Sequence, residues 1–100
     1  MKQKRLNSNE IVKRIEGKRI DIRKYNVKKI GLFGSFAKNK QHPKSDVDII
    51  VNFNKETFDN YMDLLFLLER LLKRKVDLVI EKDLHPGLEY VKKEAKYVRL

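Results

Sequence analysis

The stretch GLFGSFAKNKQHPKSDVDIIVNF, residues 31–53, decides the fold of this 100-residue chain. It joins the end of one apolar run to a second apolar run through a polar segment, and Asp46 and Asp48 stand where the second run begins. A buried strand gains nothing from two carboxylates, because each loses its hydration when it is desolvated without a partner. The stretch therefore predicts two strands, Val27–Phe33 and Val47–Phe53, with a cation-binding site at the start of the second.

Three aspartates are the candidate metal ligands and catalytic acids. Side chains alternate between the two faces of a strand, so Asp46 and Asp48 share one face while Val47 points to the core. Two neighbouring carboxylates repel each other, and a divalent cation with oxygen ligands relieves that repulsion. Asp77 is the polar residue inside KVDLVI, residues 75–80, and it joins the pair if the two strands are neighbours. Three such carboxylates suit a phosphoryl-transfer site with one or two magnesium ions.

Each acid also has a structural interpretation. Asp46 can close a turn together with the preceding serine, and Asp77 can pair with Lys73 or Lys75. Asp48 is harder to explain in this way, because Ile-Ile-Val follows it directly. The three acids taken together favour the catalytic interpretation, since clustered titratable groups mark functional sites.

A glycine–serine pair, Gly34 and Ser35, directly follows the first predicted strand. Glycine allows a positive φ angle and a close approach of the backbone, so the following N–H groups and the Ser35 hydroxyl can face phosphate oxygens. The sequence around it is neither a P-loop nor a dinucleotide-binding fingerprint. The pair gains weight from the acids, which lie within fifteen residues of it.

The remaining pattern predicts helices over residues 9–24, 58–74 and 86–98 and a third strand over residues 75–80. The fold class is α+β (α/β), with a small mixed β-sheet of about three strands flanked by helices. We expect a single domain over residues 1–100. Apolar residues surround the 58–74 helix almost completely, and Phe66 and Leu67 exceed what one core-facing stripe requires. They either pack under another helix or meet a partner or a second copy of the chain.

Composition limits the function. A formal charge of +10 suggests an affinity for polyanions, but the 24 lysines and arginines are spread along the chain without aromatic interleaving. We therefore expect a basic surface and no dedicated nucleic-acid groove. The absence of cysteine excludes disulfides and thiolate catalysis and fits a cytoplasmic protein. No apolar run is long enough to cross a membrane.

Gly34-Ser35, ten further residues and then Asp46-Val47-Asp48 resemble the signature of the DNA polymerase β superfamily of nucleotidyltransferases. The whole chain resembles the minimal nucleotidyltransferases (MNT), which are antitoxins paired with HEPN-domain toxins. The resemblance implies a nucleotidyltransferase fold in which Asp46, Asp48 and Asp77 hold two Mg²⁺ ions. It also implies that Gly34 and Ser35 bind the triphosphate.

Lys38 and Ser45 complete the expected nucleotide-binding set. The family commonly has Gly-Ser-x-Ala-Arg-Gly, whereas here Gly34-Ser35-Phe36-Ala37 is followed by Lys38 and Asn39. Lysine keeps the positive charge but lacks the two-pronged contact of arginine with phosphate. Without glycine at position 39 we expect a less permissive loop and a lower affinity for the triphosphate.

The resemblance implies a Mg²⁺-dependent protein adenylyltransferase that transfers AMP from ATP to a hydroxyl group of a HEPN toxin and so acts as its antitoxin. Two alternatives stay open. The chain can neutralise the HEPN protein by binding alone, or it can adenylylate a small molecule. The intact acids favour the first function over binding alone, and the small size of the chain favours a protein acceptor.

Overall fold

The computed structural model describes residues 6–100 of the chain. The helices and strands follow in this order: α1 (Ser8–Gly17), α2 (Arg19–Lys24), β1 (Val27–Phe33), α3 (Gly34–Ala37), β2 (Val47–Phe53), α4 (Phe58–Leu72), β3 (Val76–Ile80), the 3₁₀ turns η1 (Glu81–Asp83) and η2 (Pro86–Leu88), α5 (Tyr90–Glu94) and β4 (Lys96–Tyr97).

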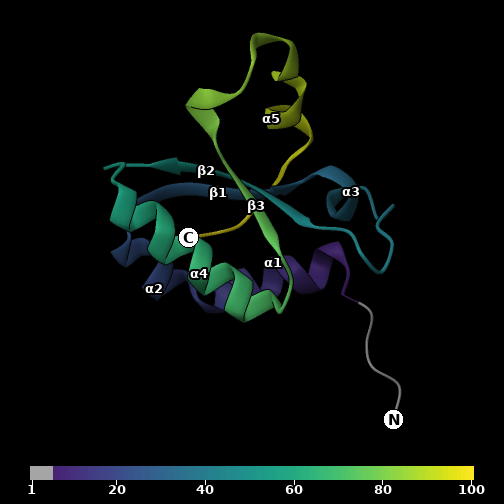
Figure 1. Cartoon of the computed structure of the whole chain (residues 1–100), viewed down its shortest axis with the longest axis horizontal. Coiled ribbons are helices and arrows are strands. Elements are labelled where there is room, and N and C mark those ends of the chain that lie inside the picture. The colour runs from purple at the N-terminus through teal and green to yellow at the C-terminus, as the bar shows by residue number, and fades with distance from the viewer. Residues whose placement is uncertain (1–5) are drawn as a thin grey trace.

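The strands form one sheet in the order β3-β2-β1-β4 (Figure 1). Strand β1 is antiparallel to both β2 and β4, whereas β2 and β3 are parallel. The expected mixed sheet with flanking helices is confirmed, as are the two strands predicted from residues 31–53. The sheet has four strands in place of about three.

The fourth strand lies in the segment predicted as the end of a helix over residues 86–98, and that part of the prediction is wrong. Helix α5 ends just before Lys96–Tyr97, which pairs with Gly31 and Leu32 of β1. Gly31 permits this pairing, because a Cβ atom there would lie 2.9 Å from the Tyr97 ring. A strand of two residues has no periodicity of its own, so the sequence gives no signal for it.

The helix predicted over residues 9–24 is divided into α1 and α2, which meet at Lys18. Gly17, the last residue of α1, has a low helix propensity and favours an interruption at this point. The N-terminus of α1 is capped by Asn7, whose side chain accepts a hydrogen bond of 2.9 Å from the Glu10 N–H. The predicted apolar face survives the break, since three isoleucines are fully buried: Ile11, Ile15 and Ile22.

Helices α1, α2 and α4 cover one face of the sheet and enclose the main core with it (Figure 1). Apolar side chains from these helices, from α3 and from the two central strands interlock there. Those with no exposed surface are Ile11, Ile15, Ile22, Ile30, Leu32, Phe36, Val47, Ile49, Leu64 and Leu68. Because the main core lies on one face of the sheet, the opposite face takes no part in it.

Helix α4 has well-defined ends. The Thr57 hydroxyl caps its N-terminus by accepting a hydrogen bond of 3.0 Å from the Asn60 N–H. The helix ends at Leu72, two residues before the predicted end at residue 74. Lys73 follows in the left-handed conformation, with a φ of 54°. None of the helices within residues 6–100 has the length and apolar content needed to cross a membrane.

Phe66 and Leu67, the apolar residues of α4 beyond one core-facing stripe, differ in how much of their surface is exposed. The Phe66 side chain is 55% exposed, whereas Leu67 is partly buried and packs against the main core. Leu67 therefore belongs to the core, whereas Phe66 is exposed. A contact of Phe66 with a partner or a second copy stays a prediction.

The segment from η1 to α5 lies on the other side of the sheet from α4 (Figure 1). Ile50 of β2 and Val91 of α5 are buried apart from the main core, with 1% and 8% of their surfaces exposed. Because side chains alternate along β2, Asp48 and Ile50 share this second face. The acids therefore lie on the face that the large helices leave open.

Candidate active site

The carboxylate of Asp48 lies directly against Gly34, at the point where β1 passes into α3. The register explains the contact, because Asp48 is opposite Phe33, the residue before the glycine. Gly34 has a φ of +73°, and a Cβ atom there would lie only 3.0 Å from Cγ of Asp48. Any other residue would be strained and would displace the acid, so the close approach and positive φ expected of Gly34 are both observed.

Asp48 and Asp77 lie side by side on neighbouring strands. Strands β2 and β3 run parallel, and their register places these two residues opposite each other. Adjacent strands are about 4.8 Å apart, so two carboxylates on one face are forced close together. Asp46 is exposed and comes immediately before β2. The predicted neighbourhood of the second and third strands is confirmed.

The electrostatics of this cluster are unfavourable to the ionised form of Asp48. Burial, together with the negative charges of Asp77 and Asp46, raises the pKa of this carboxyl from 3.8 to about 6. Asp48 is thus close enough to both other acids to be affected by their charges. A cation placed between them would remove the cause of this repulsion.

Within residues 6–100 no three histidine, aspartate or glutamate side chains already form a metal site. The donor set nevertheless fits magnesium, because carboxylate oxygens are the ligands that this ion prefers. The raised pKa of Asp48 gives a second reason, since burial and the charges of Asp77 and Asp46 all disfavour an ionised carboxylate that has no cation beside it. Asp46, Asp48 and Asp77 are therefore the residues that could hold the metal.

Lys38, an expected nucleotide contact, follows α3 and forms an ion pair of 3.3 Å with Glu94 of α5. Both side chains are about half exposed, at 51% and 49%. Next to it, Asn39 has a φ of 54°, the left-handed conformation in which glycine is preferred. Asparagine tolerates this conformation better than most residues, so the loop keeps the backbone geometry despite the missing glycine.

Ser45, the other expected nucleotide contact, closes a turn. Its hydroxyl accepts a hydrogen bond of 2.9 Å from the His42 N–H, and its own N–H donates to the His42 carbonyl at 2.9 Å. Arg74 fixes this loop by donating to the carbonyls of Pro43 and Ser45, at 2.9 and 3.4 Å. The loop before Asp46 is therefore held in place, and a contact of Ser45 with a nucleotide stays a prediction.

Sequence reasoning missed three residues around the site. Glu94 contacts Lys38, which is 56 residues away along the chain, and Arg74 contacts the loop before Asp46, which is 29–31 residues away. No local sequence pattern indicates these contacts. The Tyr61 hydroxyl donates a hydrogen bond of 2.6 Å to the Leu78 carbonyl, next to Asp77. Burial raises the pKa of Tyr61, and the charge of Asp77 adds to this effect.

Fold and site together define the class. Acids at the starts of two neighbouring strands lie against a glycine–serine turn on a mixed sheet, which agrees with the nucleotidyltransferase signature in the sequence. The chain belongs to the nucleotidyltransferase domain family, whose family model matches residues 9–99. The chain is therefore a nucleotidyltransferase, as its sequence signature predicted.

Its relatives are named for one reaction. A Methanocaldococcus jannaschii protein named "Putative protein adenylyltransferase MJ1379" is 47% identical over 73 residues, which cover 70% of this chain and 71% of that protein. A Thermococcus cleftensis protein named protein adenylyltransferase MntA is 36% identical over 77 residues, covering 75% and 78% of the two chains.

Solved structures agree with the fold. A structure described as a "putative minimal nucleotidyltransferase" matches with a TM-score of 0.78 and 27% identity, over 98% of this chain and 100% of that one. A chain of the complex described as a tri-AMPylated Shewanella oneidensis HEPN toxin with an MNT antitoxin matches with a TM-score of 0.59 and 25% identity, over 86% of this chain and 70% of that one. A toxin–antitoxin structure containing AMP-PNP matches with a TM-score of 0.64 and 30% identity, over 82% and 70%.

Proposed function

We propose that this chain transfers AMP from ATP to a hydroxyl group of a HEPN-domain protein and so acts as its antitoxin. The observation that carries the proposal is the position of Asp48, which is opposite Asp77 in the sheet and in contact with Gly34. That position puts the acids and the glycine–serine turn at one place. Relatives named protein adenylyltransferases and a matching complex with an AMPylated HEPN toxin support the choice of reaction and acceptor.

The residues have separate tasks in the reaction. The missing side chain of Gly34 leaves room for the Asp48 carboxylate beside the turn. The backbone at Gly34, the Ser35 hydroxyl and Lys38 donate hydrogen bonds to the β- and γ-phosphate oxygens. Asp46, Asp48 and Asp77 would hold Mg²⁺, which when bound neutralises charge on the triphosphate and favours ionisation of the acceptor hydroxyl. Positioning and charge neutralisation provide most of the acceleration.

The bond changes are those of an in-line displacement. The acceptor oxygen forms a bond to the α-phosphorus, and the bond from that phosphorus to the oxygen bridging to the β-phosphate breaks. Asp77 takes up the proton of the acceptor hydroxyl. Pyrophosphate leaves, and AMP stays attached to the acceptor.

Contacts with the acceptor belong to the same proposal. Phe66 of α4 is exposed, and the 58–74 helix offers a surface for a hetero-oligomer with the HEPN protein or for a second copy of the chain. ATP is the expected donor and Mg²⁺ the expected metal. We place the protein in the cytoplasm, and no nucleic-acid groove takes part.

Mass spectrometry of the intact acceptor tests the function. A HEPN-domain protein, sought first in the reading frames that neighbour this chain's gene, is incubated with the chain, ATP and Mg²⁺, and we expect its mass to increase by one or more AMP groups. The double variant Asp46→Asn, Asp48→Asn should fold and leave the mass unchanged. An unmodified but inhibited toxin would instead establish neutralisation by binding, and equal modification by the double variant would refute the assigned acids.

A further inference from the structure

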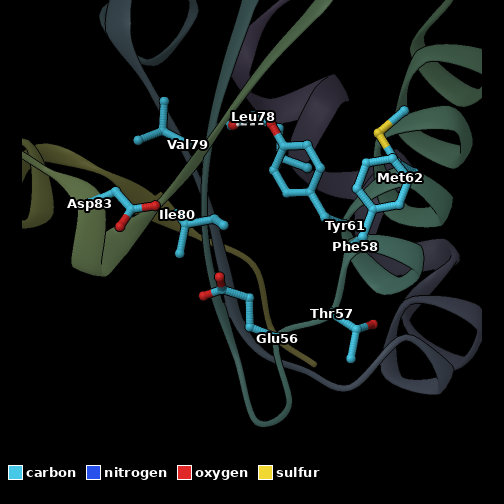
Figure 2. A pocket seen from close by; sticks show the side chains of 9 residues that line it. All are labelled: Glu56, Thr57, Phe58, Tyr61, Met62, Leu78, Val79, Ile80 and Asp83. Carbon is cyan, nitrogen blue, oxygen red and sulfur yellow. Dashed lines mark hydrogen bonds between the residues drawn. The ribbon is translucent and has the colours of Figure 1, made fainter.

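An open groove of about 560 Å³ lies between the first turns of α4 and the end of β3 (Figure 2). One wall comes from residues 56–62 and the other from residues 78–83. Figure 2 shows the Tyr61 ring reaching from the helix toward the Leu78 carbonyl, with Phe58 and Met62 beside it along the helix. The groove therefore has a predominantly apolar wall along the helix and a mixed wall along the strand.

Phe58 is the most exposed large apolar side chain among the described residues, at 77%. It occupies the first position of α4, where the helix requires no aromatic residue, and its ring contributes nothing to the main core. Aromatic residues and methionine are enriched where proteins bind other proteins, because they give a large contact area. Phe58 and Met62 thus form an apolar rim that an occupant would cover.

The free edge of the sheet passes through the groove, since β3 is the outermost strand on this side. Two of its outward backbone groups are already bound: the Leu78 carbonyl by Tyr61, and the Val76 N–H by the Glu69 carboxylate at 3.0 Å. These bonds prevent a continuous fifth strand from pairing with β3. An occupant must therefore be held by side chains in the groove.

The two charged side chains that line the groove are both acidic, in contrast to the chain as a whole. Glu56 and Asp83 line it, and Figure 2 shows their carboxylates on the side away from Phe58. Glu56 is paired with Lys82 at 3.0 Å, so Asp83 is the acid of the groove that has no ion pair within residues 6–100. This setting repels a triphosphate and attracts a lysine or arginine.

The groove also adjoins the acids of the site. Leu78, which lines it, is the residue after Asp77, and Val79 lies on the same face of β3 as Asp77. A segment held in the groove can thus continue onto the open face of the sheet. There its next residues would reach the carboxylates.

We propose that this groove docks a segment of the acceptor protein in which an apolar side chain stands beside a lysine or arginine. The apolar side chain packs on Phe58, Tyr61 and Met62, and the cation lies beside the Asp83 carboxylate. The docking of an acceptor protein in this groove rests on the proposed function. The binding of a peptide in the groove can be measured by itself, without nucleotide or metal.

Selection from a phage-displayed library of random 12-residue peptides on the immobilised full chain tests the binding. The selected peptides are synthesised, and their affinities for wild type, Phe58→Ala and Phe66→Ala are measured by fluorescence anisotropy. Phe66 is the matched control, because it is an exposed phenylalanine of the same helix that does not line the groove. Circular dichroism confirms that both variants fold.

We expect the selected peptides to contain an apolar residue next to a lysine or arginine. Their affinity for the chain should fall at least tenfold in Phe58→Ala and less than twofold in Phe66→Ala. Failure to enrich any peptide, an acidic consensus, or equal losses in the two variants would overturn the proposal. So would sedimentation of the wild type as a dimer that Phe58→Ala dissociates, because the occupant would then be a second copy.

The mass assay on the HEPN-domain protein separates the two proposals. If Phe58→Ala modifies that protein at the wild-type rate at limiting concentration, the docking role is wrong and the proposed function stands. If peptides bind as expected but wild type adds no AMP to the HEPN-domain protein, the groove stands and the proposed function is wrong.

Discussion

Replacing Asp48 by asparagine should stabilise the metal-free protein at neutral pH. In the folded state the pKa of this carboxyl is raised from 3.8 to about 6, so folding disfavours its charged form. Each pKa unit corresponds to about 1.4 kcal/mol, which gives roughly 3 kcal/mol for the whole shift. Because Asp48 is only partly buried, solvent screening reduces this to about 1–2 kcal/mol.

The pH dependence follows from the direction of the shift. Below pH 3.8 the carboxyl is protonated in both states and its environment costs no stability. The cost grows as pH rises from 3.8 to about 6, and above that value it is fully present. Asp48→Asn should therefore gain about 1–2 kcal/mol at pH 8 and only a small fraction of that at pH 4.

Urea denaturation with EDTA at both pH values measures the effect. The control is Asp63→Asn, which replaces an exposed aspartate of α4 and should change stability by no more than about 0.5 kcal/mol at either pH. Addition of Mg²⁺ in place of EDTA should stabilise wild type more than Asp48→Asn. The reasoning is refuted if Asp48→Asn destabilises the protein at pH 8, or if its gain is the same at pH 4.

Four further substitutions test other parts of the site and the fold. Glu94→Gln should tighten ATP binding about two- to fivefold in a calorimetric titration, because it releases Lys38 from an exposed ion pair worth less than about 1 kcal/mol; weaker binding would contradict a phosphate contact of Lys38. Gly34→Ala should abolish AMP transfer and lower the free energy of unfolding in urea by roughly 1–3 kcal/mol, because the new methyl group combines a positive φ with a clash against the Asp48 carboxylate. Transfer at the wild-type rate would show that the Asp48 carboxylate does not need the space beside Gly34. Phe66→Glu should leave the thermal midpoint close to that of wild type, whereas Leu67→Glu should lower it strongly, because only the second side chain packs against the core; equal effects would contradict the difference in burial.

The sequence by itself determined the local parts of the site. Alternation in a strand put Asp46 and Asp48 on one face and Val47 in the core, and a glycine directly after a strand predicted a backbone that other residues cannot adopt. Helix α4 was equally readable, since its apolar residues recur at the helical period over four turns. These features depend on residues that are close together in the chain.

Local patterns were insufficient where neighbouring elements decide the conformation. Residues 96–97 form a strand because β1 presents a free edge, with Gly31 leaving room for the Tyr97 ring. The division between α1 and α2 at Lys18 depends on how two short helices both reach the same core. Neither outcome has a periodic signal.

Only the tertiary structure decided how the separate parts of the site and the groove combine. The opposition of Asp48 and Asp77 requires β2 and β3 to be adjacent, parallel and in one register, and each strand alone is compatible with other pairings. The ion pair of Lys38 with Glu94 and the groove between residues 56–62 and 78–83 likewise join distant segments. The physical reason is that alternation and helical periodicity specify which face of an element is buried, whereas packing between elements specifies which faces meet.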